Sequence, residues 1–450
     1  MKVIQNTGDI FSALGISAKH NIRIKDFQID SRKIKKNSVF LGLTGANEDG
    51  SIYGKKAIAK GAALAITKST KPQLVNKLRS NILSVAKPEE SLVALAKSAL
   101  IKFPGPMIGI TGSNGKTTTK NILHTGIKNS FATFNNFNNE IGLPLCALAL
   151  DTKNTAAIFE MGAAKKGDIE FLSQLIKPKI GIITHIGHSH LQGLRSLNGV
   201  LKVKSELIYH IQTNGLAILP ESPYIKYWKR LRTDISYKTF GLNDSADFFA
   251  TNIKSTKAGT IFNINSPYLI KKITVQTPLL GNHNILNILA GFIATLELKE
   301  DVGFFVDSLK DFANASQRLQ LQPWFNQSTL IDDSYNANPD SVKAAINVLH
   351  QQAGRRILVL GDMKELGRYR KKLHQDIGEY AKAKGVNLFV GFGDLTRHSV
   401  LSFGSAGIFF TSKTELMEFL KNEVTRGDFI LLKGSRSMKM ETVINIGESK

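Results

Sequence analysis

Apolar residues along this chain gather in short continuous runs, separated by segments with helical spacing. Three such runs, at residues 107–111, 156–162 and 180–187, lie close together, and a helical segment follows each of them. Continuous apolar runs are typical of strands buried on both faces of a parallel sheet. Their alternation with helices is typical of an α/β fold. The pattern therefore predicts a parallel sheet covered by helices in the middle of the chain.

The two ends of the chain repeat this alternation. Near the start, a strand-like run at 39–45 is followed by residues 55–67, which have the pattern of a helix that leads into another strand. A strand-like run at 81–87 and a helical segment at 91–103 come next. Toward the end there are five strand-like runs, and segments with helical spacing lie between most of them. The runs lie at 329–335, 355–363, 387–393, 407–412 and 428–435. Both ends are therefore expected to be α/β as well.

Breaks in this pattern divide the chain into three parts. Pro104, Gly105 and Pro106 interrupt it after the first part, as expected of a turn or boundary, and a third α/β section begins near residue 314. We therefore expect an α/β protein with three consecutive domains, at 1–103, 104–313 and 314–450.

The central part contains one stretch of a different kind. Residues 236–276 alternate polar and apolar positions, which indicates an antiparallel extension of the sheet. Residues 281–298 then have apolar positions at helical spacing, which predicts a helix.

Composition limits the classes of protein that the chain can represent. Its 450 residues exceed what one core usually holds, and no run of about 18 apolar residues predicts a membrane span. A single cysteine, Cys146, excludes an internal disulfide framework and favours a reducing cytoplasm. The first residues lack the long apolar segment of a signal peptide. A cytoplasmic protein is therefore expected.

The charge balance favours anionic partners. The chain has 59 Lys and Arg against 36 Asp and Glu, a net charge of +23, which attracts nucleotides, phosphorylated substrates, nucleic acid or acidic lipid. The basic residues are dispersed, however, and no nucleic-acid motif accompanies them. A generally basic surface is expected rather than a nucleic-acid groove.

Residues 109–119, GITGSNGKTTT, have the composition of a phosphate-binding loop. A strict P-loop has four residues between its first glycine and the Gly-Lys pair, but that position here is Ile110. The physical ingredients are nevertheless present, because a buried strand leads into glycines and a helix is expected to begin near Lys116. Lys116 can then reach terminal phosphates, and the Thr117 hydroxyl can ligate magnesium.

Three further residues suggest metal chemistry near this loop. Glu160 ends the strand-like run at 156–162, where P-loop enzymes place an acidic residue for magnesium. His190 follows the next strand, together with His185 and His188, but their spacing matches no zinc template. Lys204 lies in a helical segment, where a solvated lysine is the ordinary interpretation.

Nine motifs together resemble the Mur ligases of peptidoglycan synthesis. They occur in family order, between residues 113 and 436: SNGKTTT, NNFNNEIGLPL, FEMGA, HSHLQGL, KVKSELI, GNHNILN, DDSYNANPDS, LGDMKELG and KGSR. With DSRKIKKNSVFLGLTG, which begins at residue 30, the match covers nearly the whole chain. The resemblance implies a UDP-sugar-binding first domain, a central P-loop ATPase domain and a Rossmann-like last domain.

The resemblance also implies an activity. Members of the branch with these motifs use ATP to join D-alanyl-D-alanine to UDP-N-acetylmuramoyl-tripeptide through an acyl phosphate. A monomer with two Mg²⁺ ions is expected, and Lys204 falls where the family carries a carbamylated lysine. A carbamate is a hard oxygen anion that suits Mg²⁺, whereas an ammonium repels it.

Site residues carry over position by position. Lys116, His190 and Lys204 resemble the catalytic residues, and the metal ligands implied are Thr117, Glu160, His190 and Lys204. The nucleotide contacts implied are Gly112, Ser113, Asn114, Gly115, Lys116, Thr117, Thr118, Asn284, Arg318, Asp333, Asn336 and Asn338. The substrate contacts implied are Ser31, Arg32, Thr44, Gly45, Asn138 and Asn139. For the polar loop residues in these sets, a turn or helix-cap role is the structural alternative.

Departures and rivals limit the interpretation. Gln192 stands where the family pattern has a carboxylate, which affects substrate contacts rather than the reaction. The Asp-Asn-Pro-Arg signature of ligases that add the third peptide residue is absent, as is the Asn-Lys-x-Asp signature of GTPase switches. Whether the third residue of the acceptor peptide is diaminopimelate or lysine stays open.

Overall fold

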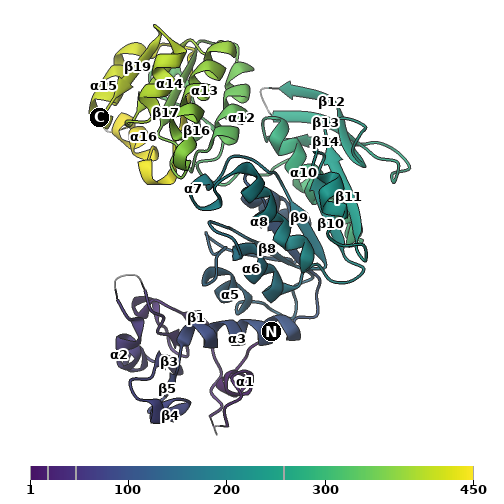
Figure 1. The fold of residues 1–450 in the computed structure, drawn as a ribbon, viewed down its shortest axis with the longest axis vertical. Coiled ribbons are helices and arrows are strands. Elements are labelled where there is room, and N and C mark those ends of the chain that lie inside the picture. The colour runs from purple at the N-terminus through teal and green to yellow at the C-terminus, as the bar shows by residue number, and fades with distance from the viewer. Residues whose placement is uncertain (1, 18–19, 46–47, 257–258, 449–450) are drawn as a thin grey trace.

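Three β-sheets follow one another along the chain in the computed structural model, which describes residues 2–17, 20–45, 48–256 and 259–448. In Figure 1 the first part lies at the bottom of the view, the second in the middle and the third at the top. Within the described residues, no helix is long and apolar enough to cross a bilayer.

The first sheet has five strands in the order β1-β2-β3-β5-β4. All neighbours pair in parallel except β4 and β5. The strands are β1 (Phe27–Gln28), β2 (Val39–Leu41), β3 (Leu64–Lys68), β4 (Lys77–Arg79) and β5 (Ile82–Val85). The helices are α1 (Thr7–Ala13), η1 (Ser31–Lys33), η2 (Gly50–Tyr53), α2 (Gly54–Ala59), η3 (Pro72–Leu74) and α3 (Pro88–Lys102).

The central sheet has nine strands in the order β14-β13-β12-β11-β10-β9-β6-β8-β7. Its strands are β6 (Met107–Thr111), β7 (Phe131–Ala132), β8 (Ala157–Glu160), β9 (Ile180–Ile183), β10 (Leu216–Pro220), β11 (Ser236–Gly241), β12 (Phe248–Thr256), β13 (Gly259–Asn265) and β14 (Ile273–Thr277). The helices are α4 (Lys116–Gly126), α5 (Gly142–Ala147), α6 (Asp168–Ile176), α7 (Leu191–Leu194), α8 (Leu197–Tyr209), α9 (Ile225–Lys229), α10 (Asn282–Glu297) and α11 (Val302–Ser308).

The antiparallel extension predicted for 236–276 is confirmed in part. β12, β13 and β14 pair antiparallel, but β11, at the start of that stretch, pairs in parallel with both β10 and β12. The prediction was wrong for β11 because its last residues are buried on both sides, so its alternation does not mark a solvent face.

Both faces of the central sheet are covered. Ile108 and Ile110 of β6 belong to one buried apolar cluster, which includes residues of α4 and α10. Phe159 of β8 and Ile183 of β9 belong to another, which includes residues of α6 and α8. This double burial is the physical reason for the continuous apolar runs in the sequence.

The third sheet has six strands in the order β15-β16-β20-β17-β18-β19. Only the β15–β16 pair is antiparallel. The strands are β15 (Gln320–Pro323), β16 (Thr329–Asp333), β17 (Arg356–Gly361), β18 (Leu388–Phe392), β19 (Gly407–Phe410) and β20 (Phe429–Lys433). The helices are η4 (Phe325–Gln327), α12 (Pro339–His350), η5 (Gly367–Tyr369), α13 (Arg370–Ala383), α14 (Thr396–Phe403), α15 (Lys413–Glu423), η6 (Arg436–Met438) and α16 (Glu441–Glu448).

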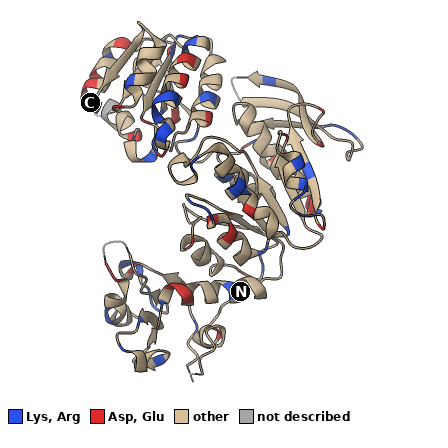
Figure 2. Ribbon diagram, in the orientation of Figure 1, with Lys and Arg blue, Asp and Glu red and all other residues tan. Residues whose placement is uncertain are grey.

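Basic side chains are spread over the molecule. Figure 2 shows Lys and Arg on all three parts, interspersed with Asp and Glu. The basic residues are therefore dispersed over the fold, as the sequence predicts.

Candidate active site

A cleft of ≈ 1380 Å³ lies between the central and third parts. Residues that follow β6, β8 and β9 line its central side, and residues that follow β16, β17 and β20 line the facing side. Ligands of open parallel sheets bind outside the carboxyl ends of the strands. The cleft brings two such edges together.

The glycine-rich loop joins β6 to α4 on the floor of this cleft. Gly112 and Gly115 have φ values of 149° and 83°, which disfavour other residues. A Cβ on Gly115 would also lie 2.3 Å from the Asn287 side-chain oxygen. α4 begins at Lys116, so the amide groups of its first turn are left for an anion in the cleft.

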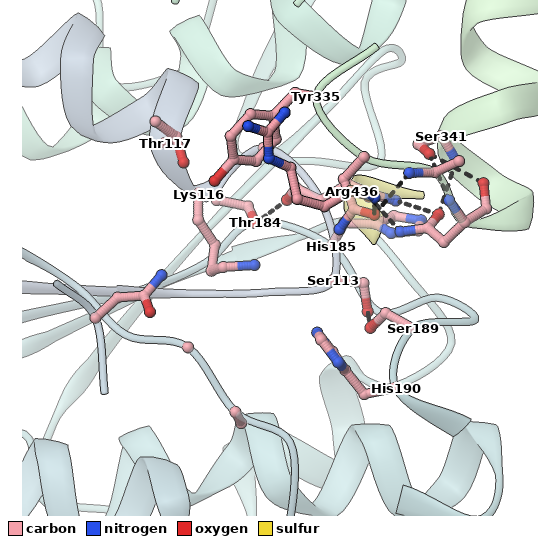
Figure 3. Close-up of a pocket in the computed structure, with 18 of the residues that line it drawn as sticks. Ser113, Lys116, Thr117, Thr184, His185, Ser189, His190, Tyr335, Ser341 and Arg436 are labelled. Atoms are coloured by element: carbon pink, nitrogen blue, oxygen red, sulfur yellow. Dashed lines mark hydrogen bonds between the residues drawn. The ribbon is translucent and has the colours of Figure 1, made fainter. Parts of the chain in front are cut away.

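Lys116 lies at the start of α4 and lines the cleft (Figure 3). Its Nζ donates to the Gly112 carbonyl oxygen at 2.8 Å. Burial lowers the pKa of Lys116, and the nearby Glu160 carboxylate opposes that shift. The side chain folds back over the loop, in the place where a phosphate would meet it.

Glu160 provides a buried carboxylate beside the loop. The Thr117 hydroxyl donates to its Oε2 at 2.9 Å, and Asn138 Nδ2 donates to its Oε1 at 3.0 Å. Glu160 is 5% exposed, and a buried carboxylate is stable only when it is paired or bound to a cation. The hydroxyl and the carboxylate together offer hard oxygen donors of the kind that Mg²⁺ prefers.

The loop after β9 places two histidines against the third part. His188 donates its backbone N–H to Asp340 Oδ2 at 2.6 Å, and the side-chain contact between them raises the pKa of His188. His190 Nδ1 contacts Glu365 Oε2. Both histidines line the cleft, and the ring of His190 is visible at its edge in Figure 3.

Lys204 of α8 is among the predicted site residues but does not line the cleft. It is 1% exposed, and burial lowers its pKa well below the usual value, with the positive charge of Lys116 acting in the same direction. The neutral amine that burial favours is the form of lysine that reacts with CO₂.

The third part contributes a buried ion pair to the cleft. Lys433 Nζ donates to the Asp333 carboxylate, and also to the Asn336 carbonyl oxygen at 2.8 Å. Burial raises the pKa of Asp333, while the charge of Lys433 opposes that shift. Asp333 is therefore held by a lysine rather than left open on the cleft wall.

Tyr335 bridges the two walls of the cleft. Its hydroxyl donates to Asn136 Oδ1 at 2.6 Å, and the guanidinium carbons of Arg318 and Arg436 lie 4.3 and 5.8 Å from its ring centroid. Arg318 Nη2 also donates to the Thr117 hydroxyl at 3.4 Å. The cleft thus carries two guanidinium groups opposite the loop.

Several asparagines predicted as ligand contacts hold the backbone. Asn139 Oδ1 accepts from Gly142 N at 2.8 Å, Asn284 Nδ2 donates to Leu280 O at 2.8 Å, and Asn336 Oδ1 accepts from Ala337 N at 2.8 Å. Asn338 caps α12 and exchanges hydrogen bonds of 3.3 and 2.7 Å with Asn114. All five line the cleft, and Asn139 and Asn338 also bond the backbone in the way that turn and cap residues do.

The remaining predicted residues fall into two groups. Ser113 and Thr118 line the cleft, whereas Gly112 is not among the residues that line it. Ser31, Arg32, Thr44 and Gly45 lie in the first part and do not line the cleft. Arg32 donates to the Asp30 carboxylate at 2.9 Å through both Nε and Nη2.

Sequence reasoning missed several residues of the cleft, among them Tyr335, Glu365, Lys433 and Arg436. Each of these four lies within a motif that carries the resemblance, DDSYNANPDS, LGDMKELG or KGSR. That membership was the available signal, but only the relative placement of the two sheets brings these side chains to the loop.

The donor set of the cleft fits Mg²⁺ rather than a structural transition metal. The described residues contain no group of three His, Cys, Asp or Glu side chains arranged to hold a metal ion. A site made of Thr117, Glu160 and phosphate oxygens needs no such group, because Mg²⁺ is usually held by one or two carboxylates together with substrate phosphates and water.

Comparison with known families finds Mur ligase domains along the chain. Residues 23–100 match the Mur ligase family catalytic domain, residues 110–295 the Mur ligase middle domain, and residues 317–436 the Mur ligase glutamate ligase domain.

Full-length relatives and solved structures agree with this result. The chain is 33% identical to a UDP-N-acetylmuramoyl-tripeptide–D-alanyl-D-alanine ligase of Buchnera aphidicola, covering 99% of the chain and 96% of the relative. It is 32% identical to the Bacillus subtilis ligase of the same name, covering 92% of this chain and 91% of the relative. MurF from Acinetobacter baumannii superposes with a TM-score of 0.90 at 27% identity over 99% of both chains. MurF of Thermotoga maritima in complex with ADP superposes at 0.84, with 26% identity over 94% of this chain and 97% of that one.

Proposed function

The chain belongs to the Mur ligase family, with its three-domain α/β architecture, and we propose that it is the ATP-dependent ligase that adds D-alanyl-D-alanine to UDP-N-acetylmuramoyl-tripeptide. One observation carries the proposal: the phosphate loop with Lys116 and Glu160 faces Arg318 and Lys433 across one cleft. Full-length relatives with that printed name support the choice of substrates.

The reaction needs an activated carboxylate, because a carboxylate is a poor electrophile. An oxygen of the peptide carboxylate attacks the γ-phosphorus of ATP, the bond to the β-phosphate oxygen breaks, and ADP leaves. The amine of D-alanyl-D-alanine then attacks the acyl carbon, loses a proton and expels inorganic phosphate. Positioning and charge stabilisation dominate such transfers.

The chain's residues divide these tasks. Amide groups of the loop and of the first turn of α4 receive phosphate oxygens, and Lys116 supplies positive charge beside them. Arg318, next to Thr117, faces the same phosphates from the third part. Positive charge from both walls offsets the repulsion between an anionic substrate and an anionic nucleotide.

Mg²⁺, when bound, would neutralise phosphate charge that develops during transfer. Thr117 and Glu160 would hold the ion on the nucleotide side. His190, together with a carbamate on Lys204, would hold a second ion. The burial of Lys204 supports carbamylation, because it favours the neutral amine.

We assign the binding of the UDP end of the substrate to residues 1–103, through Ser31, Arg32, Thr44 and Gly45. We assign the ATPase activity to residues 104–313, and the wall of the cleft on the side of the amine substrate to residues 314–450. We also assign the contact with the muramoyl-peptide to Asn138 and Asn139, and the bond from Asn138 to Glu160 supports a position near the metal site. We expect a cytoplasmic monomer, as the resemblance of the sequence to the family implies.

A phosphate-release assay tests the proposal. Purified protein with ATP, Mg²⁺ and UDP-muramoyl-tripeptide should release phosphate with D-alanyl-D-alanine and not with single amino acids or glutamate. Lys116→Met should abolish the release, and Lys128→Met, an exposed lysine just beyond α4, should leave it unchanged. Equal release with glutamate and a folate acceptor would refute the assignment. Separate titrations with lysine- and diaminopimelate-containing acceptors would determine the third residue.

A further inference from the structure

A short junction joins the loop after β9 to the loop after β17, across the boundary between the central and third parts. His190 Nδ1 contacts the carboxylate of Glu365. Two residues along, Gln192 donates its backbone N–H to the Glu365 carbonyl oxygen at 2.9 Å. Glu365 is thus engaged by the same loop through both its side chain and its backbone.

Both residues of this pair have unusual backbone conformations. The φ values are 51° for His190 and 61° for Glu365, in the left-handed region, which is strained for residues other than glycine. Such conformations persist only where the surroundings hold them, and they gather at functional sites. A surface ion pair formed by chance would not require both partners to adopt them.

Packing fixes the junction around the pair. Leu191, Leu194 and Leu366 are 3%, 5% and 2% exposed and belong to one apolar cluster. Gly367 packs against the opposite segment, and a Cβ there would lie in ordinary van der Waals contact, 3.4 Å from the Gln192 Cα atom. The contact is therefore a docked surface rather than two mobile side chains.

The same loop is tied to the nucleotide loop on its other side. Ser189 Oγ donates to Ser113 Oγ at 3.0 Å, and Ser113 Oγ donates to the Gly187 carbonyl oxygen at 3.0 Å. His190 follows Ser189 directly, so its position depends on the phosphate loop and on Glu365 together.

We propose that Glu365 is a positioning residue for His190, which the third domain supplies when it docks. Its carboxylate accepts the Nδ1–H of His190, which fixes the tautomer with a lone pair on Nε2 and directs that nitrogen to the cleft. The inference rests on the proposed function only in taking His190 as a metal ligand.

Such outer carboxylates have a known physical effect. A histidine that binds a metal usually donates its other ring N–H to a carboxylate, carbonyl or water, and loss of that partner typically weakens metal binding about 10–100-fold. Because Glu365 comes from a different domain from His190, domain docking and completion of the metal site become one event. Mg²⁺ affinity at this position would then depend on closure.

Mn²⁺ binding to the full-length protein tests the inference without turnover. Mn²⁺ is titrated into the protein in the presence of ADP, and the electron paramagnetic resonance signal of free Mn²⁺ is followed. The same titration into ADP without protein gives the background. Glu365→Ala should weaken one class of Mn²⁺ site at least tenfold, and Glu365→Gln, which keeps an acceptor for Nδ1–H, should restore part of the affinity. Glu418→Gln, an exposed glutamate of the same domain, should behave as the wild type.

A double-variant cycle separates positioning from general damage. If Glu365 acts through His190, the double variant of Glu365→Ala with His190→Ala binds Mn²⁺ no more weakly than His190→Ala alone. Additive losses, or unchanged Mn²⁺ binding in Glu365→Ala, would overturn the inference while leaving the ligase proposal intact. Unchanged binding in His190→Ala would also overturn it. Loss of amine selectivity in the phosphate-release assay would refute the ligase proposal instead.

Discussion

Replacing Asp333 with alanine should destabilise the third domain, because Lys433 would be left buried without its anionic partner. Asp333 and Lys433 end adjacent strands and lie opposite each other in the β16–β20 register. The Lys433 side chain is 3% exposed and that of Asp333 is 12% exposed. Removing one partner of a buried pair costs roughly 3–5 kcal/mol, because the other charge loses its compensation.

The structure places the expected cost at the low end of that range. Lys433 keeps the Asn336 carbonyl oxygen at 2.8 Å as an acceptor after the carboxylate is removed. A loss of about 3 kcal/mol corresponds to roughly a hundredfold change in an equilibrium constant. The slowest amide protons of β16 and β20 should therefore exchange about a hundredfold faster in Asp333→Ala.

Hydrogen exchange followed by mass spectrometry measures this change strand by strand. The double variant of Asp333→Ala with Lys433→Met removes both charges and should recover most of the loss. Asp394→Ala, at a side chain that is 89% exposed, should change exchange by less than about threefold. Unchanged exchange in Asp333→Ala, or a double variant less stable than the single one, would contradict the view that an unpaired buried charge sets the cost.

Three further predictions follow from single residues. Burial lowers the pKa of His283 from 6.5 to about 4, so the stability that its neutral form contributes is present above pH 6.5 and is lost as the pH falls toward 4. In thermal melts between pH 4 and 7, His283→Gln should therefore lose less stability with acid than the wild type. Gly115→Ala should abolish nucleotide binding in calorimetric titrations, because φ is 83° and the new Cβ would lie 2.3 Å from a side-chain oxygen. Gly427→Ala, with a similar φ of 84° and open space, should leave binding intact, and equal effects of the two would refute the steric cause. Arg318→Lys should weaken ADP binding about tenfold, since lysine does not replace a planar guanidinium stacked over Tyr335, and unchanged affinity would contradict that role.

The sequence predicted most strands of the parallel sheets, because burial on both faces leaves continuous apolar runs. β6, β8 and β9, and the five strands from β16 to β20, lie within the predicted segments. β10 was not predicted, although it is as apolar as its neighbours, and β15 is a short edge strand with alternating burial. Edge strands carry weaker patterns, since one side of them meets solvent.

The candidate site was predictable where one loop carries its chemistry. Gly115, Lys116 and Thr117 lie within a recognisable motif, and Glu160 ends the adjacent strand. Contacts between domains were not predictable, because the His190–Glu365 pair depends on how two sheets are placed relative to one another. Local spacing in the sequence contains no information about that placement.

A few polar contacts join the two walls of the cleft, in addition to the packed junction at Glu365. Asn114 and Asn338 exchange two hydrogen bonds, and Tyr335 donates to Asn136. Each hydrogen bond contributes about 1 kcal/mol net, so together they amount to a few kcal/mol. A nucleotide that enters the loop would compete for Asn114 and replace these bonds rather than add to them. The net stability of the contact between the two walls then depends on the difference between the two sets of bonds, which is of the size that ligand binding can reverse.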